Sequence, residues 1–142
     1  MTTGLTHAER FDDKGRTAAE KRNVATVRAI FEKLSQGDFS GLFLNLAPGG
    51  SFWICGFTPE RLPAKARDPN FFPDLFCNGM HFDIKQVAVD GDTIVVEWID
   101  DAVTKDGKKY ENTGCNWFTF NDEGKIINYR EYIDPEKFFA VL

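Results

Sequence analysis

The stretch from residue 93 to residue 134 constrains the fold most, because three strand-like runs are joined there by short turns. The runs are rich in β-branched and aromatic residues, and the turns between them carry Asp, Asn and Gly. This pattern predicts an antiparallel meander with strands at Thr93–Thr104, Lys109–Phe120 and Lys125–Ile133. Strongly polar residues stand in mid-strand among aromatics, as in a ligand pocket: Asp100, Asn112, Asn116 and Glu131.

Helical patterns come before the meander. Thr17 followed by Glu20 matches a capping box, and an apolar stripe then recurs at three-to-four spacing until Gly37, so a long amphipathic helix is expected. Asp38 can cap a second, shorter helix. The other expected elements are inward-facing Phe39, Leu42, Phe43 and Leu46 on that helix, strands at Ser51–Gly56 and Met80–Val89, an aromatic lid at Asn70–Phe76, and a terminal helix opened by Pro135.

The length of 142 residues fits one domain, which we expect at 17–142, after a polar arm at 1–16 that is either mobile or a strap over a second subunit. The net charge of -5 disfavours nucleic acid as a partner. No apolar run is long enough for a membrane span, and the first twenty residues lack a signal segment, so a cytoplasmic protein with no membrane partner is expected.

Cysteine and histidine are too few and too scattered for an obvious metal site. Cys55, Cys77 and Cys115 have no metal-ligand spacing and are expected to be reduced, partly buried thiols. His7 and His81 are the only histidines, and His81 is expected at a surface or interface. Neither a metal nor another cofactor is therefore predicted.

The faces of the strands depend on the turns between them, because side chains alternate along a strand. A left-handed bulge at Gly107 would place Asp100 opposite Asn112 and Trp98 opposite Gly114. A plain two-residue turn would instead bring Asp101 to the Asn112 face, and the sequence leaves both open. We favour the bulge because it keeps the large apolar residues of this strand on the inward side.

The next turn decides where the last strand places its acid. A two-residue loop of Asp122 and Glu123 would pair Gly114 with Glu131 and Asn116 with Tyr129, all on one apolar face. The opposite face also carries apolar residues, which are Val95, Ile99, Cys115, Trp117 and Ile126. A second copy of the chain is the simplest cover for that face, so a homodimer through the outer sheet face is expected.

The runs VDGDTIVVEW, DGKKYENTGCNWFTF and, most specifically, GKIINYREYID resemble the SnoaL-like branch of the nuclear-transport-factor-2-like superfamily, over about residues 20–142. The resemblance implies an α+β, cystatin-like fold in which a cone-shaped, curved antiparallel sheet wraps around the long N-terminal helix. It also implies a hydrophobic cavity at the open end and dimerisation. Members include polyketide cyclases, ketosteroid isomerase, limonene epoxide hydrolase and scytalone dehydratase, so the fold does not fix the function.

Site residues follow from a comparison with limonene epoxide hydrolase. The positions of its early-strand Tyr and Asn fall on Trp53 and Cys55, its Arg on Trp98, and its two Asp on Asp100 and Glu131. Two carboxylates survive and the other positioning groups do not, which disfavours epoxide hydrolysis. The paired histidines of scytalone dehydratase are also missing from this chain.

Glu131, with Asp100, is the expected catalytic acid or base, because a carboxyl group among aromatics acquires a raised pKa. The alternative is a buried acid paired with Asn116 or with an arginine such as Arg28. The expected ligand-binding residues are Trp53, Cys55, Phe72, Phe76, Trp98, Asn112, Asn116 and Tyr129, of which the last three can hold a carbonyl or enolate oxygen. An asparagine that binds neighbouring backbone is the competing reading for Asn112 and Asn116.

The sequence is compatible with two functions. One is a cofactor-independent enzyme that moves a proton next to the carbonyl of an apolar cyclic ketone, polyketide or terpenoid-like substrate. The other is a non-catalytic, dimeric ligand-binding module with the same cavity.

Overall fold

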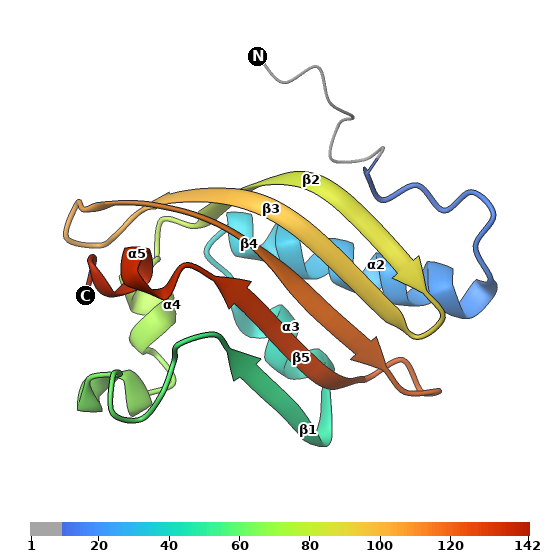
Figure 1. The fold of residues 1–142 in the computed structure, drawn as a ribbon, viewed down its shortest axis with the longest axis horizontal. Helices are drawn as coiled ribbons and strands as arrows, with labels where there is room; N and C mark the ends of the chain where they lie inside the picture. The colour runs from blue at the N-terminus through green and yellow to red at the C-terminus, as the bar shows by residue number, and fades with distance from the viewer. Residues whose placement is uncertain (1–9) are drawn as a thin grey trace.

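A computed structural model describes residues 10–142, which form a curved, open, five-stranded sheet with helices against one face and at one end (Figure 1). The strand order is β1-β5-β4-β3-β2. The α+β class expected from the sequence is confirmed. The strands are β1 Leu46–Ile54, β2 Met80–Asp90, β3 Thr93–Val103, β4 Lys109–Phe120 and β5 Ile126–Ile133, and the helices are α2 Ala18–Ser35, α3 Ser40–Asn45, α4 Phe71–Leu75 and α5 Pro135–Phe139, with a 3-10 turn η1 at Ala64–Arg67.

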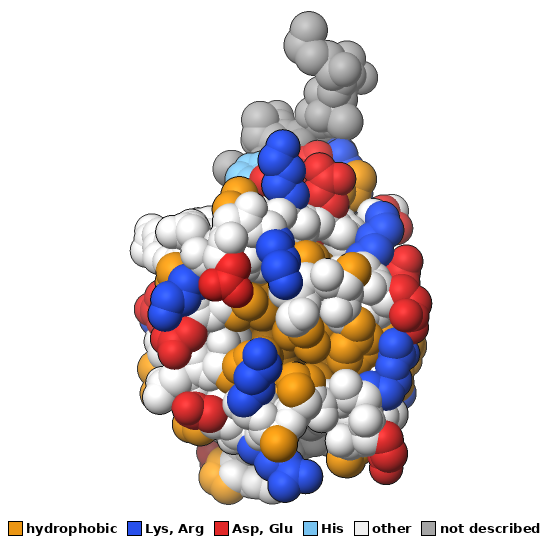
Figure 2. Space-filling view, turned by 90° about the vertical axis from the view of Figure 1, so that its left-hand side faces the viewer, with side chains coloured by type: hydrophobic (Ala, Val, Ile, Leu, Met, Phe, Trp, Pro, Cys, Tyr) orange, Lys and Arg blue, Asp and Glu red, His pale blue; other side chains and the backbone are white. Residues whose placement is uncertain are grey.

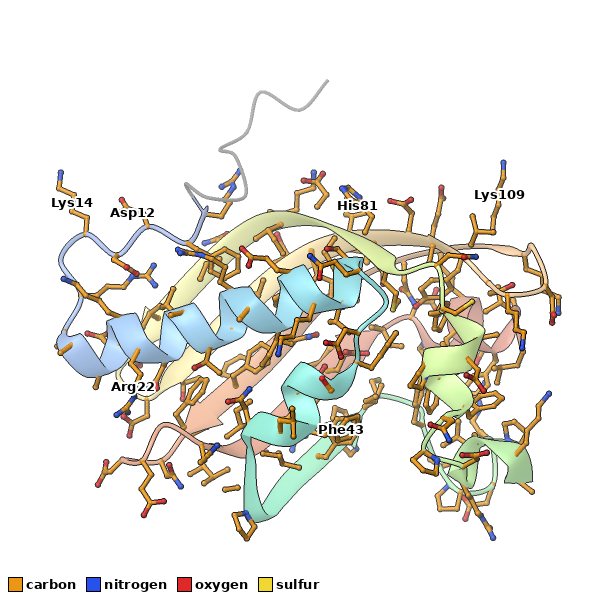
Figure 3. All side chains as sticks on the ribbon, turned by 180° about the vertical axis from the view of Figure 1, so that it is seen from behind. Asp12, Lys14, Arg22, Phe43, His81 and Lys109 are labelled. Carbon is orange, nitrogen blue, oxygen red and sulfur yellow. The ribbon has the colours of Figure 1, made fainter. Side chains whose placement is uncertain are left out.

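The long helix α2 lies across one face of the sheet, as the apolar stripe predicts (Figure 3). Thr17 caps it through both bonds of the capping box, since its hydroxyl accepts from the Glu20 amide at 3.1 Å and its own amide donates to the Glu20 carboxylate at 3.0 Å. Part of the predicted arm, residues 1–9, lies outside the described residues. Within the remainder, Phe11 is buried with its ring 6.5 Å from that of Phe31 on α2.

The second helix is shorter than expected, and Leu46, which was expected on it, is the first residue of β1. Asp38 bonds the amide of Ser40 at 2.9 Å where α3 starts, but the helix is only six residues long. Phe43 was expected inward and is 59% exposed, on α3 beside β1 (Figure 3). A six-residue helix makes fewer than two turns, so its apolar residues cannot all share one buried face.

The first strand is the other departure from the predicted sheet. Its predicted range of Ser51–Gly56 is wrong, because the observed β1 starts five residues earlier and ends at Ile54. It pairs with β5 in parallel, whereas the other strand pairs are antiparallel. The pairing breaks register between Leu46 and Ser51, where Gly49 has a φ of 74°.

The predicted bulge between β3 and β4 is confirmed. Gly107 has a φ of 83°, and the Thr104 amide donates to the carbonyl of Lys108 at 2.8 Å. Asp100 consequently pairs with Asn112, and Trp98 with Gly114. The side chains that alternate inward on β3 are buried as expected: Ile94, Val96, Trp98, Asp100 and Ala102.

The predicted register between β4 and β5 is wrong by two residues. Asn116 pairs with Glu131, not with Tyr129, and Tyr129 pairs with Phe118. The connecting turn is the same kind of bulge, with Gly124 at a φ of 77° and the Asn121 amide bonded to the Lys125 carbonyl, which moves the register by one residue. An irregularity between Thr119 and Phe120 moves it by one more. Because the two shifts add to an even number, the side chains from Asn128 to Ile133 keep their predicted faces. Ile126, which lies between the two shifts and was expected on the outer face, is instead buried in the core.

Two apolar clusters fill the space that the sheet encloses. The first lies between α2 and the sheet and includes Phe31, Trp98 and Tyr129. The second lies at the end where α4 and α5 meet the sheet, and it includes Phe76, Tyr110 and Phe138. Seen from this end, hydrophobic side chains gather at the centre of the surface with charged side chains around them (Figure 2). The polar mid-strand residues lie between the two clusters.

Candidate functional site

The polar residues of the meander share the inner face of the sheet in two cross-strand rows. One row contains Asn116 and Glu131, and the other contains Asp100 and Asn112. The row between them holds Trp98, Gly114 and Ile133. The two carboxyl groups expected to carry the chemistry therefore lie diagonally across this middle row.

Gly114 is the position of the middle row that has no room for a side chain. A Cβ atom there would collide with the carbonyl oxygen of Tyr132 and would lie 3.1 Å from Cη2 of the Trp98 ring. The space above the glycine is taken by that ring, which is itself 5.1 Å from the ring of Phe82 in an edge contact. A glycine is required here because the carbonyl oxygen of Tyr132 occupies the place of a Cβ atom, and the indole of Trp98 leaves little room beside it.

Glu131 is the partly exposed member of the carboxyl pair. The hydroxyl of Tyr129 donates a hydrogen bond to its Oε1 atom at 2.5 Å. Burial raises the pKa of Glu131 above its usual range, and the bond from Tyr129 opposes that rise. Among residues 10–142, no hydrogen bond to the second oxygen, Oε2, is formed, so this atom is the one left for a ligand. The predicted pairing of Glu131 with Asn116 or Arg28 does not form, and Arg28 instead donates to the carbonyl of Phe11.

Asp100 is the deeply buried member of the pair, with 1% of its surface exposed. Burial, and then the charge of Glu131, raise its pKa to about 7, while the backbone of Asn112 acts in the opposite direction. Its Oδ1 atom is enclosed and has no hydrogen-bond partner in the described part of the chain. An enclosed oxygen without a partner is more stable in a neutral carboxyl group than in a carboxylate. Burial and the missing partner therefore both favour the neutral form of Asp100.

Asn112 is committed to the backbone at the end of β5. Its side-chain amide donates to the carbonyl of Asp134 at 3.0 Å and to the hydroxyl of Tyr110 at 2.8 Å, and its oxygen accepts from the amides of Asp134 and Thr113. Both amide hydrogens are used, so none is left for a ligand oxygen. The competing reading of this residue, an asparagine that binds neighbouring backbone, is the one the geometry supports.

Asn116 and Tyr129 lie beside Glu131 and bond to other side chains. The oxygen of Asn116 accepts from the indole N–H of Trp98 at 3.1 Å, and its nitrogen donates to the Tyr129 hydroxyl at 3.1 Å. All three side chains are buried. One amide hydrogen of Asn116 remains for another acceptor.

The predicted aromatic walls Phe72 and Phe76 belong to the cluster at the α4 and α5 end. Phe72 lies 5.6 Å from Phe138, and Phe76 lies 5.3 Å from Tyr110, measured between ring centroids. This places them beside the row of Asp100 and Asn112. Trp98, in contrast, packs in the cluster under α2.

The structure does not bring Trp53 and Cys55 to the inner face. Trp53 is in edge contact with Tyr132 at 5.1 Å and lies under the guanidinium of Arg130, on the side of the sheet opposite to Glu131. Cys55 follows the end of β1 and donates its backbone amide to the carbonyl of Glu131 at 2.9 Å. The neighbour of Trp53, Phe52, is the residue that points inward and stacks on Tyr129.

Sequence reasoning missed Phe52 and Tyr110. The ring of Phe52 stacks on that of Tyr129, with 4.9 Å between the centroids and 13° between the planes. On its other side, the centroid of the Phe43 ring is 5.6 Å from that of Phe52. Tyr110 could have been found, because it lies two residues before Asn112 on the same strand and shares its face. Phe52 could not, because its face depends on the parallel pairing of β1.

The outer face of the sheet carries exposed aromatic and aliphatic side chains. Trp117 pairs with Arg130, and Tyr132 with Cys115, so they share this face with Trp53. The exposed apolar side chains of this face include Trp53, Ile99, Val103, Trp117 and Tyr132.

The structure also contains a hollow away from this cluster. It has a volume of about 430 Å³ and lies between α2 and β2. His81, which is exposed and bonds the carboxylate of Asp101 at 3.1 Å, lies on its rim, whereas neither Glu131 nor Asp100 lines it.

Within residues 10–142, no group of three or more His, Cys, Asp and Glu side chains is placed to hold a metal ion. No helix in the same range is long and apolar enough to cross a membrane.

The fold and the inward-facing polar rows define a small α+β protein with a carboxyl pair on the inner face of a curved sheet. The family model of the SnoaL-like domain matches residues 27–129, and the chain belongs to this family. No curated protein sequence matches the chain.

Solved structures support the same fold. A protein from Jannaschia sp. CCS1 named as a SnoaL-like polyketide cyclase is 20% identical, with a TM-score of 0.65 over 90% of this chain and 96% of that one. An LEH-like epoxide hydrolase from M. tuberculosis is 21% identical, with a TM-score of 0.63 over 87% and 90%. An NTF2-like protein of unknown function from Burkholderia pseudomallei is 15% identical, with a TM-score of 0.60 over 84% and 96%. These similarities concern the fold.

Proposed function

We propose that this protein is a cofactor-independent enzyme in which Glu131 moves a proton next to the carbonyl group of an apolar cyclic ketone, polyketide or terpenoid-like substrate. The observation that carries the proposal is the state of Glu131. It is partly exposed, its pKa is raised by burial, one oxygen is held by Tyr129, and the other is not bonded within the described chain. A carboxylate with a pKa raised toward neutrality is suited to act as a general base.

The proposed step moves one proton and no other group. Oε2 of Glu131 takes a proton from the carbon next to the carbonyl, the C–H electron pair moves into an enolate, and the protonated acid returns the proton to a different atom of the substrate. Asn116 is the oxygen-binding candidate that remains, since it keeps one amide hydrogen.

The role of Asp100 changes from the one expected. With 1% of its surface exposed, it does not reach a ligand in this arrangement, so it acts on Glu131 through its charge. Two carboxyl groups that interact cannot both ionise freely, and the neutral form of Asp100 keeps Glu131 available as the base. Walls for an apolar ligand come from the two clusters that flank the polar rows.

The test is proton exchange at the acidic carbon of candidate ligands. A set of cyclic ketones, steroids and aromatic polyketides is incubated with the protein in deuterated buffer, and loss of the α-proton signal is followed by NMR. We expect Glu131→Gln to reduce the exchange rate at least about 100-fold, in the range of general acid–base contributions. Asp101→Asn is the matched control, because Asp101 is an exposed carboxylate on β3. Full activity in Glu131→Gln on a true substrate would show that Glu131 is not the base.

A second candidate, a non-catalytic ligand-binding module, is favoured by one observation. The polar groups of Trp98, Asn112, Asn116 and Tyr129 bond to one another and to the backbone, as they would in a structural core. In that case Glu131→Gln preserves ligand binding, as followed by thermal shift, and neither protein exchanges the α-proton at any pH.

The same proposal includes a homodimer through the outer sheet face. Exposed Trp53, Trp117 and Tyr132 surround Arg130 there, and exposed aromatics together with arginine are typical of subunit interfaces. Sedimentation at micromolar concentration tests it. A dimer that dissociates in Trp117→Glu supports the proposal, and a monomeric parent protein contradicts it.

A further inference from the structure

The hydrogen bonds that lead from the core to Glu131 form a chain in which the donors and acceptors are fixed. It runs from the Trp98 indole to Asn116, from Asn116 to the Tyr129 hydroxyl, and from Tyr129 to Glu131. We propose that Trp98 and Asn116 are positioning residues, which hold the hydroxyl proton of Tyr129 on Oε1 of Glu131 and so leave Oε2 as the proton-exchanging oxygen. This inference rests on the proposed function for its catalytic meaning.

The direction of the chain begins at Trp98. An indole N–H can only donate, so the atom of Asn116 that faces it must be the amide oxygen. The nitrogen of Asn116 is then turned toward Tyr129, 3.1 Å from its hydroxyl oxygen. That hydroxyl accepts from Asn116, and its single proton is free to point at Glu131, 2.5 Å away. One donor-only group thus fixes the orientation of three side chains.

Burial prevents water from replacing the bonds among Trp98, Asn116 and Tyr129. Trp98, Asn116 and Tyr129 are all buried, and their bonds lie in a medium of low dielectric constant, where an unmade bond is costly. The Trp98 ring cannot move away easily, because Phe82 contacts it edge-on and the Gly114 backbone lies beneath it. The ring of Tyr129 is held between Phe52 and Phe118.

Removal of the indole N–H has a remote consequence. Without that donor, the amide of Asn116 is free to turn by 180° and present its oxygen to Tyr129. The hydroxyl of Tyr129 then donates to Asn116, and Oε1 of Glu131 loses its hydrogen bond. Trp98 is not bonded to Glu131, but loss of its N–H therefore removes the hydrogen bond to Oε1 of Glu131, as loss of the Tyr129 hydroxyl does.

The titratable groups that feel the charge of Glu131 come from three strands. They are Asp100 on β3, Tyr110 and Cys115 on β4, and Tyr129 on β5. Of these, only Asp100 changes its charge near neutral pH, since its pKa lies at about 7. The experiment is therefore run in parallel in an Asp100→Asn background, where this coupling is absent.

The test is a carboxyl-carbon NMR titration of protein labelled in glutamate side chains, assigned with Glu131→Gln. It compares the parent with Trp98→Phe, Tyr129→Phe and the double variant. We expect each single change to raise the pKa of Glu131, because each removes a bond to its charged form. We also expect the double variant to match Tyr129→Phe alone, since both changes remove the same link. The matched control is Trp117→Phe on the outer face, which should leave the pKa of Glu131 unchanged.

Either of two results would overturn the inference. One is a pKa of Glu131 in Trp98→Phe that equals its value in the control Trp117→Phe. The other is a pKa shift in the double variant that equals the sum of the shifts in Trp98→Phe and Tyr129→Phe. Should Trp98→Phe fail to fold, Trp98 can be replaced by 3-benzothienylalanine, which keeps the ring and exchanges only N–H for sulfur. The same two outcomes then apply.

The titration needs no substrate, so its outcome separates this inference from the proposed function. If no candidate ligand exchanges its proton and the pKa pattern holds, the positioning chain stands and the catalytic proposal fails. If exchange is found, the pH profile of kcat/KM should shift upward in Trp98→Phe by the same amount as the NMR pKa. A rate profile that does not move shows that the chain has no catalytic role.

Discussion

The side chains of Asp100 and Glu131 face the same side of the sheet from strands that do not touch, and the row between them contains Gly114. β4 separates their strands, and the middle row contributes no side chain at the glycine. The charge of Glu131 raises the pKa of Asp100, although no hydrogen bond between them is formed.

This relationship predicts how stability depends on pH. The pKa of Asp100 rises from 3.8 to about 7 on folding, so the folded protein binds this proton more tightly than the unfolded chain. The stabilisation is present below pH 4 and is lost as the pH rises toward 7. We expect the free energy of unfolding to fall over this window by on the order of 3 kcal/mol. Urea unfolding at pH 5 and pH 8 measures the fall.

Asp100→Asn should remove most of that dependence, because the amide does not titrate. Asp90→Asn is the control, since Asp90 is an exposed carboxylate at the last residue of β2 and is not among the charges that raise the pKa of Asp100. An Asp100→Asn protein with the full pH dependence of the parent would assign the effect to Glu131 alone.

Gly114→Ala tests the packing of the row between the two carboxyl groups. The added Cβ would collide with the carbonyl of Tyr132 and meet the Trp98 ring, so we expect a loss of about 2–3 kcal/mol, as for overpacked cores. Thermal unfolding gives the loss, and near-UV circular dichroism reports whether the indole has moved. Thr113→Ala, at the exposed neighbouring position, should stay within about 0.5 kcal/mol of the parent.

Asn112→Ala tests the clamp on the end of β5. The substitution removes the bonds to the backbone of Asp134, which precedes α5. We expect a destabilisation of about 2 kcal/mol and faster amide hydrogen exchange across α5. Asn128→Ala on β5 is a suitable control. Unchanged exchange in α5 would mean that Asn112 does not hold the C-terminal helix in place.

Phe52 and Phe43 should differ in their effects although they touch each other. Phe52 covers the ring of Tyr129, whereas Phe43 is 59% exposed at the outer end of the stack. We expect Phe52→Ala to lower the free energy of unfolding by about 1–2 kcal/mol and Phe43→Ala by less than about 0.5 kcal/mol. Equal losses at both positions would show that the stack does not order these rings.

The antiparallel part of the fold followed from local signals. The capping box at Thr17, the bulge at Gly107 and the alternation along β3 each depend on residues close in sequence, and each was confirmed. Asp100 was placed opposite Asn112 for the same reason. The pairing of β1 with β5 joins segments that are far apart in the sequence, and no local signal indicates it. The inward position of Phe52 depends on that pairing and could not be predicted either.

The sequence predicted which residues lie in the candidate site better than it predicted what each of them does there. Glu131, Asn116 and Tyr129 do lie together, but what each polar atom bonds depends on distances that alternation does not give. Asn112 illustrates the limit. It faces the expected side, and its amide is nevertheless used by Asp134.

The paired register shifts at Gly124 and at Thr119/Phe120 bear on which length changes this hairpin can tolerate. Loss of a single residue from either irregularity would turn Glu131 to the outer face and bring Arg130 or Tyr132 inward. Loss of one residue from both would restore the orientation of the side chains from Asn128 to Ile133, Glu131 included. Homologous chains that keep an inward acid on this strand should therefore differ in hairpin length by even numbers of residues.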